Sequence, residues 1–167
     1  ACTTTTTTRT GEVISTTQKE APTPANMRSR ARARTDLAAG YFRNGQMAVA
    51  LEEARRAVQI DPSFADAFGL LGLIYMELDD RSAAEQNFQR SLQYFRKLHE
   101  LDTDNARYLL IIGELQKITG QFRQSAETHS SLVTNQPDFA QAWESLAETW
   151  FILDDPRAGE ALKKFRA

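Results

Sequence analysis

The side chains best suited to catalysis or metal binding are two histidines and the serines beside one of them. His129 has Ser125, Ser130 and Ser131 nearby, but no acid is placed to orient the imidazole and no oxyanion loop accompanies the pair. Neither His99 nor His129 has a cysteine or carboxylate partner at metal-ligand spacing on a shared helix face. The histidines therefore predict neither a nucleophilic active site nor a zinc site.

A second candidate for chemistry is the acidic run at residues 102–105. It begins like a calcium-binding loop but lacks the central glycine and the distal glutamate that such a loop requires. We interpret it as a turn in which Asp104 or Asn105 caps the following helix. Glycine-rich phosphate loops are also missing from the sequence. We predict a non-enzymatic protein with no cofactor and no small-molecule substrate.

The sequence divides into two parts, an N-terminal segment and a helical domain that carries the residues discussed above. The chain has 167 residues and a net charge of -2, which suits one domain and argues against a nucleic-acid partner. Residues 1–26 are rich in threonine and contain too few apolar side chains to offset the entropy of ordering, so we predict a disordered tether. Residues 27–167 repeat apolar side chains at helical spacing, which predicts an all-α domain.

The helical part is internally repetitive. In the first unit small residues such as Ala38 and Ala54 fall on the helix contact faces, Gly45 falls at the turn, and Pro62 ends the second helix. This pattern, at a period of 34 residues, is typical of tetratricopeptide repeats. It predicts a solenoid of about four antiparallel helix pairs, with units near residues 31–64, 65–105, 106–139 and 140–167.

One interval departs from the period. Ala65 and Ala106, the first residues of the second and third units, lie 41 residues apart, seven more than the 34-residue period. Seven residues make about two helical turns, so the apolar face is nearly preserved across the insertion. We predict one elongated helix near residues 82–101.

Three stretches of the first two units have more distinctive sequences than a general tetratricopeptide repeat requires. They are RARARTDLAAGYFRNGQMAVALEEARRAV, IDPSFADAFGLLGLIYMELDD and SAAEQNFQRSL. Over about residues 28–93 the chain resembles the pilotin lipoproteins of type IV pili, the PilF/PilW family, whereas residues 94–167 match only general tetratricopeptide features. The resemblance implies a protein that binds an outer-membrane secretin subunit and assists its localisation and assembly.

The N-terminus is consistent with that resemblance. In such lipoproteins the signal peptide is removed just before a lipid-modified cysteine, and Ala1-Cys2 followed by a threonine-rich segment looks like that junction. The resemblance implies that Cys2 is a lipid anchor, which would hold the domain at the periplasmic face of the outer membrane. The alternative is a free thiol in a disordered tail.

Two further clusters have more than one interpretation. Arg28, Arg30, Arg32 and Arg34 form the only basic run, which is either a solvated first turn or a contact for lipid phosphates or an acidic partner. Trp143 and Trp150 lie seven residues apart on one helix face, where they either pack between helices or stack on a ligand.

The inner face formed by the first helices of the units is the predicted partner-binding surface. It mixes apolar and charged side chains, and it lacks the Lys/Asn pattern that clamps peptide carboxylates in chaperone-binding repeats. We expect it to hold an extended or helical protein segment with apolar anchors. The predicted partner-binding residues are Phe42, Arg43, Leu73, Met76, Leu110, Glu114 and Phe151.

Two other functions remain open from sequence. One is a cytoplasmic tetratricopeptide scaffold, with Cys2 merely part of a tail. The other is a repeat module of a larger enzyme, such as a transferase, because the second half is generic.

Overall fold

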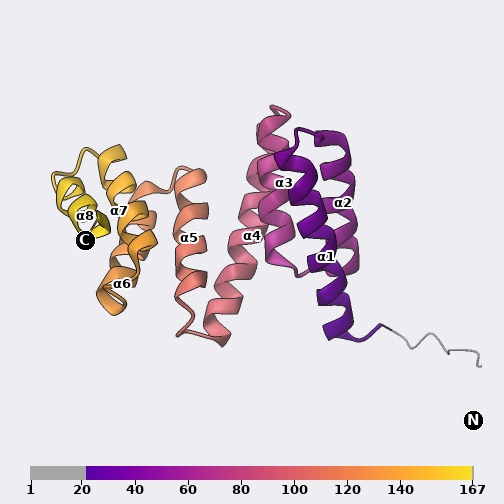
Figure 1. Cartoon of the computed structure of the whole chain (residues 1–167), viewed down its shortest axis with the longest axis horizontal. Helices are drawn as coiled ribbons and strands as arrows, with labels where there is room; N and C mark the ends of the chain where they lie inside the picture. Colours follow the sequence, from indigo (N-terminus) through magenta and orange to yellow (C-terminus); the bar gives the residue numbers. More distant parts are fainter. Residues whose placement is uncertain (1–21, 167) are drawn as a thin grey trace, which may run out of the picture.

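The computed structural model describes residues 22–166, which form eight α-helices and no strand. The helices are α1 (Pro24–Arg43), α2 (Met47–Ile60), α3 (Ala65–Glu77), α4 (Arg81–Leu101), α5 (Ala106–Ile118), α6 (Phe122–Asn135), α7 (Ala140–Ile152) and α8 (Ala158–Arg166). Consecutive helices pack in pairs, α1 with α2 through to α7 with α8 (Figure 1). The predicted all-α solenoid of helix pairs is confirmed.

The first helix begins inside the segment that we predicted to be a tether. Thr23 accepts a hydrogen bond from the amide of Asn26 at 3.3 Å, and Pro24 occupies the first turn. A threonine cap followed by proline is a strong helix start, because the cap satisfies a free amide and proline has none to leave unpaired. The boundary near residue 26 was therefore wrong by a few residues. Residues 1–21 lie outside the described part, so the tether remains a prediction there.

The turns within the four pairs share one backbone conformation. Gly45, Asp79, Gly120 and Asp154 have φ angles of 73°, 56°, 76° and 54°, in the left-handed region. They lie 34, 41 and 34 residues apart. Glycine adopts this conformation freely, and aspartate tolerates it better than most residues do. The structure thus reproduces the repeat period and its single seven-residue excess.

That excess lengthens α4, as predicted, and changes how the pairs stack. The first helices of neighbouring pairs pack on one another in the two halves, α1 against α3 and α5 against α7. Between α3 and α5, which are described over their full lengths, no comparable packing is found. Figure 1 shows α4 leaning away from α3 and carrying α5 with it. The extra turns of α4 therefore divide the inner face into two halves.

Within residues 22–166, no helix has both the length and the apolar character that crossing a bilayer requires.

Candidate protein-binding surface

Three of the predicted partner-binding residues present apolar side chains to solvent. Leu73 and Met76 on α3 are 39% and 51% exposed, and Phe151 at the end of α7 is 81% exposed. Phe42 and Leu110 lie differently, because each is partly buried against a core cluster. The solvent-exposed apolar surface of the inner face therefore comes mainly from α3 and α7, and less from α1 and α5.

The exposed phenylalanine borders an apolar hollow in the second half. The hollow has a volume of about 730 Å³ and lies between α5, the start of α6, α7 and α8. Ile118, Phe151, Ile152 and Leu162 contribute its apolar walls. Ile118 also lines a second hollow together with Met76, so apolar surface continues between the two halves at this end of the inner helices. Leu162 was missed from sequence, because it belongs to a second helix and only the pairing of α8 with α7 brings it there.

The charged residues of this face form a small network. The ammonium group of Lys117 lies 2.7 Å from Glu148 and 3.0 Å from Glu114. Burial alone would lower the pKa of Lys117, but the two carboxylates outweigh it and raise that pKa above its ordinary value of 10.5. Arg43 is exposed and forms no ion pair with any described residue. Glu114 thus lies on the predicted face but is already engaged by Lys117.

The histidine singled out by sequence is enclosed. Nδ1 of His129 lies 3.4 Å from Oγ of Ser125, which in turn lies 3.4 Å from the hydroxyl of Thr149. Nε2 lies 3.7 Å from Glu114, too far for a hydrogen bond, and has no partner among the described residues. The side chains of Ser125, His129 and Thr149 are all fully buried, so no substrate reaches them. Burial lowers the pKa of His129 from 6.5, although Glu114 opposes the shift.

The other candidate clusters also take structural roles. Trp143 donates its indole N–H to the carbonyl of Pro137 at 2.8 Å, and the guanidinium of Arg157 stacks 4.5 Å from the ring of Trp150. Both tryptophans pack against the core of the second half. Asn105 is the cap residue of α5, but its side chain bonds Asp102 instead of a helix amide. Residues 22–166 contain no group of three or more potential metal ligands.

The basic run divides into paired and free arginines. Arg28 donates to Asp61 at 3.2 Å, and Arg34 donates to the buried Glu53 at 2.6 Å. Burial raises the pKa of Asp61, but hydrogen bonds from Ser63 and Arg28 outweigh it, so that pKa lies below 3.8. These two arginines hold α1 against α2 and against the loop before α3. The solvated-turn interpretation is therefore incomplete for them.

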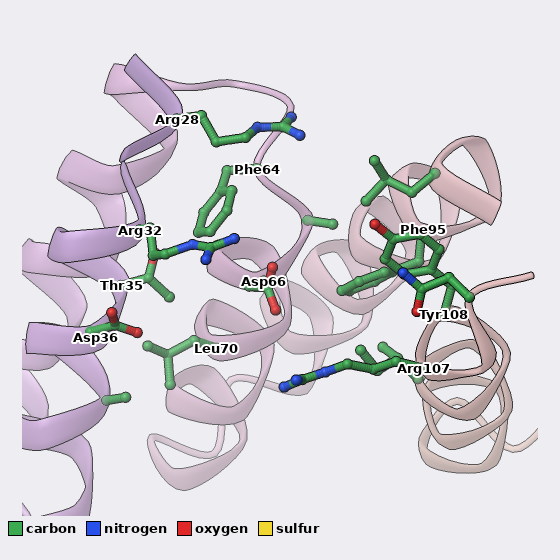
Figure 2. Close-up of a pocket in the computed structure, with 15 residues that line it drawn as sticks. Arg28, Arg32, Thr35, Asp36, Phe64, Asp66, Leu70, Phe95, Arg107 and Tyr108 are labelled. Atoms are coloured by element: carbon green, nitrogen blue, oxygen red, sulfur yellow. The ribbon is translucent and has the colours of Figure 1, made fainter. Parts of the chain in front are cut away.

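A third arginine of the run faces a cavity. This cavity of about 530 Å³ lies between α1, α3, the end of α4 and the start of α5. Arg32 enters it from α1 and Arg107 from α5, with Asp66 of α3 between them (Figure 2). Aromatic and aliphatic side chains, including Phe95 and Tyr108, complete its lining.

Comparison with known proteins agrees with this architecture. Residues 65–98 match the model of a tetratricopeptide repeat. The described chain is thus a solenoid of the tetratricopeptide type. A search of curated protein sequences gives no significant match.

Several solved structures share the fold. PilF of Pseudomonas aeruginosa superposes with a TM-score of 0.63 at 22% identity, over 83% of this chain and 61% of that one. A tetratricopeptide repeat protein of Parabacteroides merdae gives 0.61 at 23% identity, over 80% and 50%. An O-GlcNAc transferase of Thermobaculum terrenum gives 0.52 at 21% identity, over 74% and 22%. The chain therefore spans less than two thirds of the length of each of these proteins.

Proposed function

We propose that this chain is a non-enzymatic, lipid-anchored protein that binds a type IV pilus secretin subunit and assists its assembly in the outer membrane. The observation that carries the protein-binding part is the exposed apolar surface of the inner face, above all Phe151. A large apolar side chain left in water at a hollow is typical of an anchor site for a partner.

The proposed secretin partner and the proposed lipid anchor are supported by different observations. The first two units resemble the pilotin family in sequence, and the solenoid has the same fold as PilF. Cys2 lies outside the described residues, and its proposed lipid rests on the Ala1-Cys2 junction and the threonine-rich segment after it. The lipid would hold the domain at the periplasmic face of the outer membrane, and the segment up to α1 would set its reach.

The anchor is tested by intact mass and membrane fractionation of the precursor in a Gram-negative host, beside a Cys2→Ala variant. We expect the wild type to carry acyl mass and to fractionate with the outer membrane, and the variant to be soluble. An unmodified, soluble wild type would overturn the lipoprotein proposal.

The partner is tested by co-expression with the secretin subunit. We expect secretin multimers in the outer membrane only when the chain is present, and fewer when Phe151 is replaced by alanine. Leu101→Ala is the matched control, since Leu101 is 85% exposed and lines none of the hollows described above. Multimers that form equally well without the chain would remove the secretin from the proposal.

A second candidate function has one observation in its favour. The match to the transferase covers only 22% of that enzyme, so a comparable solenoid can be one module of a larger enzyme. A catalytic domain encoded in the same reading frame would support this alternative over the pilotin.

A further inference from the structure

The cavity beside Arg32 and Arg107, between the two halves of the solenoid, has no role in the function proposed above. We propose that it binds an acidic segment of a protein partner and holds one carboxylate between Arg32 of α1 and Arg107 of α5. The inference extends the protein-binding part of the proposed function, and it does not depend on the lipid at Cys2.

The cavity exists because α4 is too long for regular stacking. In the two halves, the first helices of neighbouring pairs pack on one another, α1 on α3 and α5 on α7, whereas α3 and α5 show no comparable packing. The two extra turns of α4 move α5 away from α3, and the cavity of about 530 Å³ lies in the space between them. Phe95 and Leu98, near the end of α4, form part of its wall. A partner segment can therefore enter between helices that touch in an ordinary repeat.

Two of the three arginines that line the cavity, Arg32 and Arg107, are free to bind a ligand. Arg28 also lines it, but its guanidinium is engaged by Asp61 and Ser63. Neither Arg32 nor Arg107 forms an ion pair or a side-chain hydrogen bond with another described residue. Figure 2 shows both guanidinium groups directed into the cavity from opposite sides. A guanidinium presents a fork of donors that fits a carboxylate, so two of them facing one space favour an acidic group.

The remaining lining limits what the acidic segment can be. Asp36 and Asp66 also face the cavity, so they equal in number the two arginines that remain free once Arg28 is paired with Asp61. This balance of charge disfavours a run of acids, so the proposed partner segment contributes a single carboxylate. Leu98, Tyr108 and Ile111, which are partly exposed, supply apolar surface beside the arginines, whereas Leu70 and Phe95 are buried behind them. The occupant that fits is a segment in which one Asp, Glu or C-terminal carboxylate adjoins a bulky apolar side chain.

The test is fluorescence anisotropy with the full chain, produced without lipid. The probes are a short labelled peptide in which glutamate alternates with leucine and phenylalanine, and the same peptide with glutamine in place of glutamate. We expect the glutamate peptide to bind saturably and more tightly than the glutamine peptide. A charge-assisted hydrogen bond contributes roughly 1.5–3 kcal/mol, so Arg32→Gln and Arg107→Gln should each weaken binding of the glutamate peptide about tenfold or more.

Two further variants control the measurement. Arg30→Gln removes the same charge from the same helix at an exposed position outside the cavity lining, and we expect less than about a twofold change at physiological salt. Asp66→Asn removes a repelling carboxylate from the cavity and should tighten binding of the glutamate peptide. Thermal unfolding of each variant checks that the fold is retained.

Several outcomes would overturn the inference. They are an absence of saturable binding, equal binding of the two peptides, or a loss with Arg30→Gln as large as that with Arg32→Gln. Vesicles of phosphatidylcholine with phosphatidylglycerol provide the membrane comparison. If the wild type binds these vesicles through Arg32 and ignores the peptide, the arginines serve a lipid surface and the protein-partner inference fails. None of these results bears on acylation of Cys2, so failure here is distinguishable from failure of the lipoprotein proposal.

Discussion

The imidazole of His129 lies so close to Gly113 that a β-carbon added to the glycine would stand 2.4 Å from Nε2. The same relationship joins Gly72 and Phe88, which are 41 residues earlier in the chain, at 2.5 Å. In both pairs, a glycine on the first helix gives room to a ring on the second helix. The glycines at these positions are therefore packing requirements of the solenoid.

Replacing Gly113 with alanine should destabilise the protein. The added methyl group overlaps a fully buried ring, and overpacking of this kind costs about 1–3 kcal/mol. Gly40→Ala is the matched control, because a β-carbon added to Gly40 would have nothing within 4 Å and the residue sits within α1. There alanine should stabilise the helix by up to about 1 kcal/mol. Urea denaturation measures both, and equal effects of the two variants would contradict the packing argument.

Buried His129 should make the protein less stable in mild acid. Its pKa is lowered in the folded state, so below pH 6.5 the unfolded chain takes up a proton that the folded chain does not. The free energy of unfolding then falls as pH falls from about 6.5 toward the folded pKa, and is fully recovered above 6.5. The groups that act on the ring are Glu114, Lys117 and the backbone of Leu110 from α5, Ser125 from α6, and Glu148 from α7. Thr149 of α7 contacts Ser125 behind them.

A His129→Phe variant isolates that contribution. Phenylalanine already occupies the corresponding place in the second unit, at Phe88, so the variant is expected to fold. Denaturant unfolding between pH 7.5 and pH 5.5, roughly one unit either side of the ordinary histidine pKa, should give a flatter profile for the variant than for the wild type. Identical pH profiles would show that His129 does not cause the acid sensitivity.

The paired and free arginines of the basic run should differ in their effect on stability. Arg34→Ala removes one of the two arginines that neutralise buried Glu53, at 2.6 Å, and should cost about 1–3 kcal/mol. Arg30→Ala changes an exposed side chain without an ion pair among residues 22–166 and should stay within about 0.5 kcal/mol. Thermal or urea unfolding compares them directly. A loss with Arg30→Ala as large as that with Arg34→Ala would mean that the run acts through its total charge.

Phe151 should matter for binding and not for folding. Its side chain is 81% exposed, so Phe151→Ala removes little buried area and should change the free energy of unfolding by less than about 0.5 kcal/mol. Leu146→Ala on the same helix is the opposite case, since Leu146 is fully buried and its truncation should cost about 2–5 kcal/mol. A large stability loss with Phe151→Ala would show that the residue is part of the core and not an anchor for a partner.

The helices, their pairing and the elongated α4 could be predicted from the sequence because they are local and periodic. Residues suited to tight turns recur at Gly45, Asp79, Gly120 and Asp154, and their spacing gives the repeat period. The apolar stripe along each helix indicates which helix face is buried. The same local logic identified Phe151, Leu73 and Met76 as inward positions. Helical spacing alone does not give the exposed fraction of each side chain. Phe42 and Leu110 were therefore grouped with these residues, although both are partly buried against the core.

Tertiary structure decided the features that depend on residues far apart in the chain. The ion pairs of Arg28 with Asp61 and of Arg34 with Glu53 join positions 33 and 19 residues apart, and helical periodicity carries no information on such pairs. The cavity beside Arg32 and Arg107 depends on the direction in which α4 carries α5 away from α3. The sequence determined that seven residues are inserted there, but only the packing of the helices determined that the insertion opens a space, because the angle between helices is set by side chains from several elements at once.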